Sequence, residues 1–327
     1  MPNTEMPHDN TDASFAAFTA GVLSSIGPDT PPRAREILTS LIRHLHAVCL
    51  ETRLTHSEWM MACDFVNRTG QMSDEKRNEA ILVCDVLGVE SLVDALADEA
   101  PPSHSSSSTN GEKKSTLSAI LGPFYRENSP KYKNGASIIL PDWLQSLDPQ
   151  TISSLETARI SGRVLDTSNN PICNTTLEVW LTAPNGLYEN QDPTQPDMNL
   201  RGTFTTGQDG TYSFIALKPT SYPIPYDGPA GDLLQLMGRS PWRPAHVHLK
   251  VEAPGFKGLI TQIFDRGDKY VETDSVFAVK SDLIVDFLPA RGETDAKEGV
   301  KWELEYDIVL EKEGEQSGNG TSEATEM

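Results

Sequence analysis

Two histidines separated by one residue, His246 and His248, are the first side chains of this sequence that could act together chemically. They lie where apolar and polar residues alternate, which predicts a β-strand, and side chains two positions apart on a strand share one face. Two imidazoles on one face would supply half of a metal site. The whole chain has only 7 histidines, which makes the pair unusual here. Two ordinary polar residues on a solvated face are the alternative.

The surroundings of this pair do not match the common zinc motifs. No cysteine is near it in the sequence, and no H-E-x-x-H occurs. Carboxylates are abundant, so an iron(II) site of two histidines and one carboxylate is one alternative. Tyr188 and Tyr222 are another, since both adjoin turns, and the prolines near Tyr222 would hold its side chain in place. Each tyrosine alone is equally consistent with a packing role.

The composition narrows the class of protein. The 327 residues suffice for one large domain or two smaller ones, and 47 acidic against 27 basic residues give a formal net charge of -20. Such a charge repels nucleic acid, and no apolar run approaches the ~18 residues of a membrane span. The polar N-terminus does not predict a secretory signal. We therefore expect a cytoplasmic protein without nucleic-acid or membrane partners.

The 4 cysteines are widely spaced and form no C-x-x-C pair. Cys49, Cys63 and Cys84 lie in helix-like sequence, where buried and reduced thiols are the expected state. Neither a zinc knuckle nor a redox pair is indicated.

The elements that must position these side chains change in character along the chain. Before residue 100 the apolar spacing is helical, as over residues 37–48. Thr55 and Glu58 match a capping box at the start of another helix, and further helices are expected over 73–87 and 90–97.

After about residue 117 the apolar period becomes two, which predicts strands. The expected strands cover residues 160–165, 177–181, 203–206, 212–217, 245–252, 258–264 and 302–310. The turn at 207–210 predicts a hairpin between two of them. Many strands with short turns and no intervening helices favour an antiparallel β-sandwich, so the predicted class is α+β.

Four regions are expected in consequence. They are a helical region over 1–100, a Ser-rich linker or loop over 101–116, the β-sandwich over 117–311, and an acidic tail over 312–327 that we expect to be disordered.

Several segments, taken in order, resemble the intradiol ring-cleaving catechol dioxygenases. The matching segments are Gly122-Pro123-Phe124-Tyr125, Gly186-x-Tyr188, Tyr222-Pro-Ile-Pro, Arg243-Pro-Ala-His246-x-His248, Thr261-Gln262 and Gly267-Asp268. Their order and spacing agree with the family over roughly residues 121–287. Agreement of all of them together is far more specific than any one motif.

The resemblance implies one iron(III) ion per chain. The ligands it implies are Tyr188, Tyr222, His246 and His248, with a solvent hydroxide as the fifth. Phenolate oxygen suits this hard cation, whose charge overrides the ordinary tyrosine pKa near ~10. The implied reaction opens a catechol ring between its two hydroxylated carbons and adds both atoms of O2, giving a cis,cis-muconate. In it Tyr222 also acts as a base, and Arg243 and Gln262 stabilise developing charge.

The segments around residues 187–192, 199–202 and 238–244 look most like the hydroxyquinol branch of the family. That branch cleaves 1,2,4-trihydroxybenzene to 3-hydroxy-cis,cis-muconate, which tautomerises to maleylacetate. The substrate-pocket positions implied are Pro123, Phe124, Val276 and Phe277, with Asp94 expected to meet the extra hydroxyl group.

Two alternatives stay open on the sequence. Gln262 departs from bacterial members, which often carry histidine there, so a catechol 1,2-dioxygenase is one alternative. A metal-free β-sandwich binding module is the alternative from another class. The resemblance also implies a homodimer formed through the N-terminal helices, which in this family often enclose a lipid.

Overall fold

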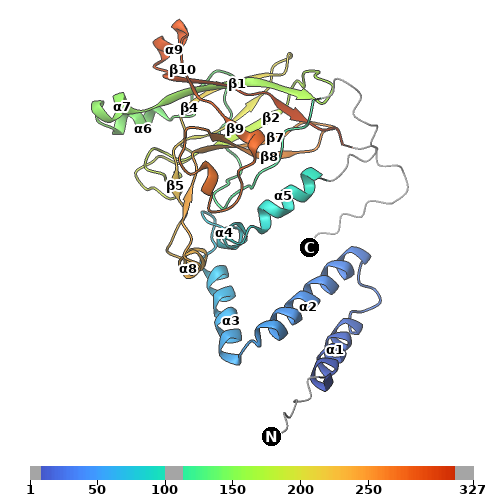
Figure 1. The fold of residues 1–327 in the computed structure, drawn as a ribbon. Helices are drawn as coiled ribbons and strands as arrows, with labels where there is room; N and C mark the ends of the chain where they lie inside the picture. Colours follow the sequence, from blue (N-terminus) through green and yellow to red (C-terminus); the bar gives the residue numbers. More distant parts are fainter. Residues whose placement is uncertain (1–8, 100–112, 314–327) are drawn as a thin grey trace. The chain divides into compact units, whose positions relative to one another are not determined.

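The computed structural model describes residues 9–99 and 113–313. The expectations for residues 101–112 and for the tail from 314 onward lie outside the described residues. The chain divides into two compact units after Asn67, and each is described by itself (Figure 1). None of the described helices is long and apolar enough to cross a membrane.

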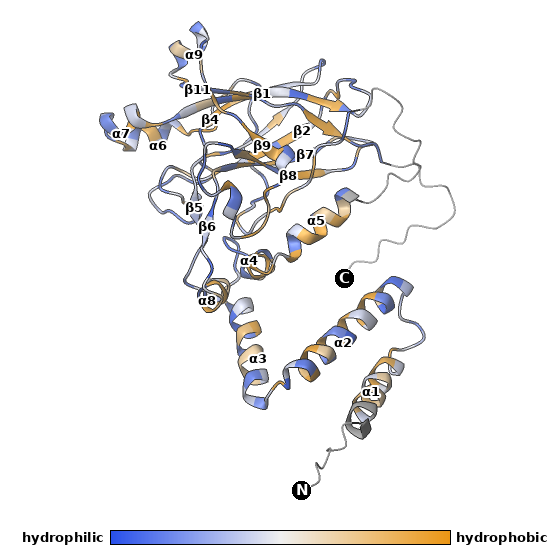
Figure 2. Ribbon diagram, in the orientation of Figure 1, coloured by the Kyte–Doolittle hydropathy of each residue, from blue (hydrophilic) through white to orange (hydrophobic). Residues whose placement is uncertain are grey.

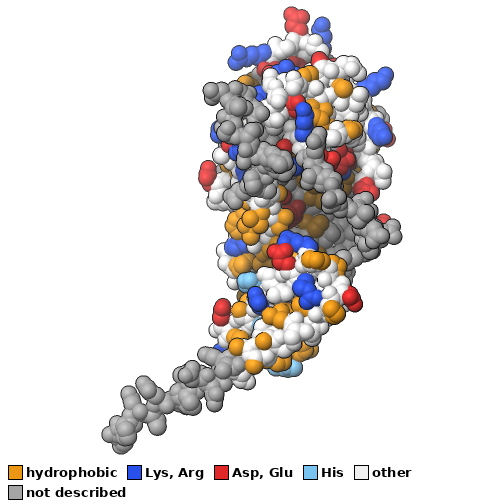
Figure 3. All heavy atoms as spheres, turned by 90° about the vertical axis from the view of Figure 1, so that its right-hand side faces the viewer, with side chains coloured by type: hydrophobic (Ala, Val, Ile, Leu, Met, Phe, Trp, Pro, Cys, Tyr) orange, Lys and Arg blue, Asp and Glu red, His pale blue; other side chains and the backbone are white. Residues whose placement is uncertain are grey.

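The first unit is helical. It holds α1 (Asp9–Ser24), α2 (Pro32–Thr52) and most of α3 (His56–Gln71). The capping box at the start of α3 is confirmed, because the Thr55 N–H donates to the Glu58 carboxylate at 2.8 Å and the Glu58 N–H donates to the Thr55 hydroxyl at 3.3 Å. The apolar face of α2 is exposed within this unit, with Leu41 50% and Leu45 55% accessible (Figures 2 and 3).

The second unit begins with two more helices, α4 (Glu79–Val86) and α5 (Val89–Glu99). The first starts later than the expected residue 73. The Asp74 carboxylate accepts hydrogen bonds from two following backbone N–H groups, which makes a turn there instead. Asn78 then caps the helix, because its side chain accepts from the Ile81 N–H.

Two five-stranded sheets follow. One has the order β10 (Leu288–Pro289), β11 (Trp302–Glu305), β1 (Thr157–Asp166), β12 (Ile308–Leu310), with β4 (Thr211–Leu217) also paired to β1. The other has the order β3 (Arg201–Thr205), β2 (Thr176–Trp180), β7 (His246–Glu252), β8 (Leu259–Asp265), β9 (Ile284–Val285). A small ribbon joins β5 (Tyr222–Pro223) to β6 (Trp242–Arg243), and the short helices are α6 (Pro141–Ser146), α7 (Pro149–Ser154), α8 (Pro229–Leu236) and α9 (Glu293–Glu298).

The α+β class is confirmed, but three details of the strand predictions are wrong. The sheets are mixed, since β1 is parallel to both β11 and β12 and β8 is parallel to β9. Residues 302–310 form two strands rather than one. The strands on either side of the 207–210 turn belong to different sheets, where the Phe204 and Phe214 rings stack with centroids 5.3 Å apart, so they form no hairpin.

The main core lies between the sheets, and the face of β7 that points away from it carries the polar side chains. Val247, Leu249 and Val251 belong to the main core cluster. The two histidines of the strand therefore point the other way, as the period of two predicted. A smaller cluster of α4 and α8 side chains packs around Ile224, next to the β5–β6 ribbon.

The prediction of buried cysteines is wrong in most cases. Cys49 and Cys84 are exposed and Cys63 is only partly buried, and the thiols of these three residues are free, as is that of Cys173. The apolar faces of the helices that carry Cys49 and Cys84 are therefore less covered by other residues of the same chain than their apolar spacing predicts.

Candidate metal centre

Four buried side chains bring their donor atoms together on the outer face of β7. Tyr188 Oη lies 3.0 Å from Tyr222 Oη and 3.0 Å from His248 Nε2. Tyr222 Oη lies 3.3 Å from His246 Nε2, and the two Nε2 atoms are 3.2 Å apart. Each donor thus has two of the others as neighbours, which closes a ring of two oxygens and two nitrogens.

Local backbone structure explains why the two tyrosines meet. Tyr222 opens β5 and pairs in register with Arg243 of β6. Tyr188 follows a turn at Gly186, which has a φ of +78°. A Cβ at Gly186 would lie 2.8 Å from the Tyr222 Cβ, so both the backbone conformation and the close approach require glycine there.

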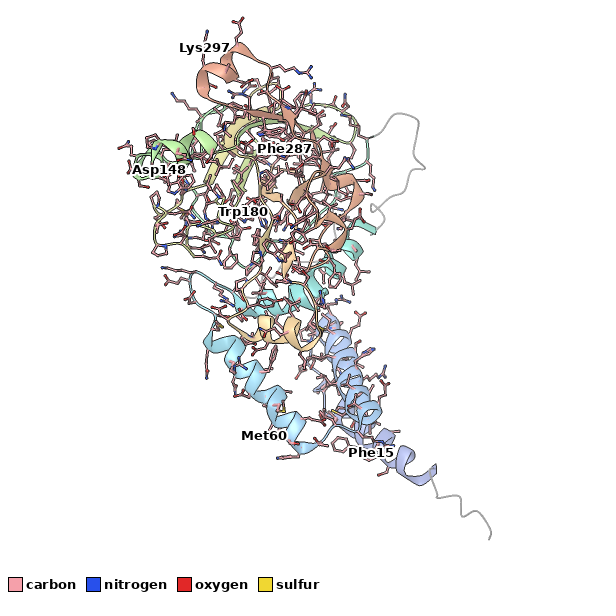
Figure 4. All side chains as sticks on the ribbon, turned by 60° about the vertical axis from the view of Figure 1, so that its left-hand side comes forward. Phe15, Met60, Asp148, Trp180, Phe287 and Lys297 are labelled. Atoms are coloured by element: carbon pink, nitrogen blue, oxygen red, sulfur yellow. The ribbon has the colours of Figure 1, made fainter. Side chains whose placement is uncertain are left out.

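Each histidine is oriented by a neighbour. His246 Nδ1 donates to the Pro244 carbonyl at 2.7 Å, which leaves the lone pair of Nε2 facing the ring of donors. The His248 imidazole stacks on Trp180, with centroids 4.7 Å apart and planes 13° apart; Trp180 is labelled in Figure 4. Gly122 lies behind His248, since a Cβ there would be 3.2 Å from the imidazole Cε1.

Burial keeps all four groups uncharged in the absence of a cation. It raises the pKa of Tyr188 well above the usual value, and the neighbouring Tyr222 adds to the effect. Burial also raises the pKa of Tyr222, which the Arg243 charge partly opposes. The pKa values of His246 and His248 are well below the usual range, because burial and then nearby positive charge disfavour imidazolium. Neutral imidazoles keep their lone pairs available for a metal.

The donor set fits a single hard cation. Ligands held about 2 Å from one ion are separated by roughly 3 Å, which agrees with the spacing of the four atoms. No group of three or more His, Cys, Asp or Glu residues that could hold a metal occurs in the described part of the chain. The alternative of two histidines and one carboxylate therefore has no carboxylate, and phenol oxygens take its place.

A buried network lies beside the ring of donors. Arg243 Nε and Nη2 donate to the Asp274 carboxylate at 3.1 and 3.2 Å, while Nη2 also donates to Gln262 Oε1 at 2.7 Å. Arg243 Nη1 lies 3.1 Å from His246 Nε2. Burial disfavours the charge of this arginine, but the Asp274 carboxylate together with Tyr222 and Tyr188 outweighs that effect and raises the pKa of Arg243. Gln262 Nε2 donates to the Ile120 carbonyl at 2.7 Å and lies 3.3 Å from His248 Nδ1.

The four residues expected to line the substrate pocket differ from one another in burial and in the groups they contact. The Phe124 ring packs against Tyr188 with centroids 5.1 Å apart, and the Pro123 carbonyl accepts from the Asn78 N–H. Val276 is buried, and its carbonyl accepts from the Ser91 hydroxyl. Phe277 is 55% exposed and stacks under Arg239 rather than against Tyr188 or Tyr222.

Two acidic residues of the helices, Asp94 of α5 and Asp85 of α4, differ in burial and in their neighbours. Asp94 is half-buried beside Ser118 and Lys280, and its Oδ2 atom is buried without a hydrogen-bond partner among the described residues. No described hydrogen bond or ion pair links it to the donor ring. Asp85 of α4 is fully buried, and its carboxyl group has the Glu90 carboxyl as a hydrogen-bonding neighbour. Burial and the neighbouring Glu90 raise the pKa of Asp85 well above its usual value, and Arg243 is near enough to oppose them.

Sequence reasoning missed Asp85 and also Arg201, a buried arginine over the Tyr188 ring. Both belong to segments whose other residues carry ordinary helix or strand patterns. An acidic residue in a short helix gives no signal of burial, so only the packing of α4 reveals it.

Comparison with known proteins places these features in context. The family profile described as "Dioxygenase" matches residues 127–312, and that described as "Catechol dioxygenase N terminus" matches residues 31–104. A catechol 1,2-dioxygenase of Candida albicans is 46% identical over 299 residues, covering 91% of this chain and 92% of that protein. A hydroxyquinol 1,2-dioxygenase of Rhizobium sp. is 41% identical over 285 residues, covering 85% and 89%.

Solved structures agree with the sequence relatives. Hydroxyquinol 1,2-dioxygenase from Pseudomonas putida has a TM-score of 0.73 and 36% identity, covering 92% of this chain and 100% of that chain. Catechol 1,2-dioxygenase from Acinetobacter radioresistens has a TM-score of 0.77 and 27% identity, covering 98% and 99%. The similarity thus extends over both the helical part and the sheets.

Proposed function

This chain belongs to the intradiol ring-cleaving dioxygenases, and from that premise we propose that it opens the ring of hydroxyquinol with O2. The proposed product is 3-hydroxy-cis,cis-muconate, which tautomerises to maleylacetate. The closed ring of two phenol oxygens and two imidazole nitrogens is the observation that carries the chemistry.

We assign one iron(III) ion per chain to this ring, with Tyr188, Tyr222, His246 and His248 as protein ligands. Phenol oxygens that are this deeply buried lose their protons only next to a strong positive charge, which such an ion provides. Bound iron(III) supplies Lewis acidity that draws electron density from a chelated catechol.

The chain's own residues position the substrate and handle its protons. Tyr222 Oη is the proposed acceptor of a substrate hydroxyl proton, since it faces the donor ring and lies close to the Arg243 guanidinium. Arg243 and Gln262 then face the negative charge that develops on the aromatic ring of the substrate and on its oxygens. Their mutual hydrogen bond and the Asp274 carboxylate hold both side chains in place before substrate arrives.

Asp85 supports hydroxyquinol over catechol. Its fully buried carboxyl group interacts with the Arg243 guanidinium and pairs with Glu90, and a third ring hydroxyl could add a hydrogen bond to it that plain catechol cannot make. We therefore propose Asp85 in the role expected of Asp94. Catechol 1,2-dioxygenase remains the second candidate, because the Candida albicans relative at 46% identity carries that name.

Comparing the two substrates tests this preference. Anaerobic addition of each to the iron-loaded protein, followed by O2 and product identification, should give the higher kcat/KM for hydroxyquinol. Asp85→Asn should reduce that preference by about 10-fold, and Asp94→Asn, a matched change in the neighbouring helix, should leave it unchanged. Equal or better turnover of catechol by the wild type would reverse the assignment, and an effect of Asp94→Asn alone would restore the original expectation. A colourless protein with a full complement of iron would eliminate the proposed tyrosine-ligated iron site and the reaction that depends on it.

We also propose a division of labour along the chain. Residues 117–311 carry the proposed iron ligands. The helices within 1–100 form a homodimer contact, which the exposed apolar side chains of α2 support, and α4 also contributes Asp85 to the substrate site. Light scattering at defined concentration tests the dimer, and native mass spectrometry tests for a bound lipid. A monomer at micromolar concentration would contradict this proposal.

A further inference from the structure

Arg201 is a charged side chain that the proposed reaction does not use. It is 1% exposed and begins β3, where it pairs in register with Trp180 of β2. Its Nε donates to the Glu189 carboxylate at 2.7 Å. Nη1 and Nη2 are buried without a hydrogen-bond partner among the described residues. An arginine held this way calls for an explanation, since a buried charge without full compensation is costly.

The counter-charge of Arg201 is shared. Glu189 also accepts from Arg126 at 2.6 Å, and Arg126 reaches outward to Asp197 with 24% of its side chain exposed. One buried carboxylate thus lies between two guanidinium groups. The positive charge of Arg201 is therefore only partly neutralised by its ion pair.

Tyr188 is a further neighbour of this charge. The guanidinium carbon of Arg201 lies 5.7 Å from the centroid of the Tyr188 ring, and Glu189 is the next residue in the chain. An aromatic face attracts a cation weakly, and a phenolate ring attracts it strongly. The arginine is thus best compensated when Tyr188 has lost its proton, as it does when it binds a ferric ion.

We propose that Arg201 is a positioning residue that sets how strongly Tyr188 donates electrons to the metal. It acts through Tyr188 in two ways: its charge stabilises the electrons of the phenolate, and its bond to Glu189 fixes the loop that carries the tyrosine. The proposal rests on the proposed function, because it needs iron(III) at this centre.

The effect has a visible readout. Phenolate bound to iron(III) absorbs visible light as an electron moves from the ring to the metal. Removing the positive charge beside the ring raises the energy of the donor electrons, so the band moves to longer wavelength, by a shift on the order of 10 nm with screened charges. The same change makes the iron(III)/iron(II) midpoint potential more negative, since a stronger donor stabilises the ferric state.

The experiment compares iron-loaded variants by band position and midpoint potential. Arg201→Met removes the charge and keeps most of the volume, so we expect the longer-wavelength band and lower potential. Arg201→Lys keeps the charge and should stay near the wild type. Arg126→Met is the matched control, because Arg126 binds the same carboxylate but has no described contact with the Tyr188 ring. An unshifted Arg201→Met band, or an equal shift in Arg126→Met, would overturn the proposal.

Glu189→Gln gives a second test of opposite sign and serves if Arg201→Met does not fold. It removes the counter-charge and leaves Arg201 uncompensated, so the band should move to shorter wavelength and the potential should rise. A purely structural role predicts no such reversal, and shifts of both variants in one direction would refute the electrostatic mechanism. Failure of the proposed function is separate: it would appear as a wild-type protein that holds iron without any visible band.

Discussion

Replacing Gly186 by alanine tests the geometry of the metal centre directly. The new Cβ would lie 2.8 Å from the Tyr222 Cβ, and the backbone φ of +78° is one that alanine adopts only with strain. The strain costs roughly 1–2 kcal/mol. The overlap involves Cβ atoms, which cannot rotate away, so the Tyr188 loop and the β5 backbone must separate.

Gly255 provides a matched control for the strain. Its φ is +79°, and a Cβ there would meet nothing within 4 Å. Urea titrations of the metal-free proteins measure the free energy of unfolding. We expect backbone strain to lower it by a similar amount in Gly255→Ala and in Gly186→Ala. The Cβ overlap should lower it further in Gly186→Ala alone. Only Gly186→Ala should weaken iron binding. Its affinity for iron, measured by competition with a chelator, should fall by about 10-fold or more, since misplaced ligands bind metal poorly. Equal iron retention by the two variants would refute the reasoning.

Other predictions concern the ligands, the arginine network, a titrating carboxylate and a helix cap. His246→Ala should lose bound iron and activity together in metal analysis and turnover assays, whereas Arg243→Met should keep iron and lose about 10²-fold in kcat. The pKa of Asp94 is raised to about 6, first by burial, so its ionisation destabilises the fold as pH rises from about 4 through 6. Asp94→Asn should therefore raise the Tm at pH 8 but not at pH 4. Thr55→Ala removes a cap and should lower helix stability by about 1 kcal/mol, measured by denaturant unfolding.

The parts of the fold that sequence could predict are those set by local spacing. The capping box at Thr55 and the shared face of His246 and His248 follow from the geometry of one helix or one strand. The order of strands does not, because it depends on which distant segments pack. Tyr306 illustrates this: its carbonyl lies where a Cβ on Gly162 would be, so the chain leaves its ladder with β1 there and the expected strand over 302–310 divides.

The candidate site shows the same limit. Motif resemblance named the four donors, and the structure brings them together. Asp94 stays a prediction that rests on its place in a helix. The burial of Asp85 is found only by knowing what packs against α4. Arg201 was missed for a similar reason, since strand patterns do not reveal where a long charged side chain ends.

The central strand β1 has a consequence for how the protein is made. It pairs with β4 nearby, but also with β11 and β12, so that Val164 aligns with Ile308 across a long stretch of chain. During synthesis the backbone N–H and C=O groups on one edge of β1 stay unpaired until β11 and β12 have left the ribosome. Exposed strand edges pair readily with other chains. Slow maturation and dependence on chaperones at high expression are the expected cost of this topology, and a nascent chain stalled before Trp302 should aggregate.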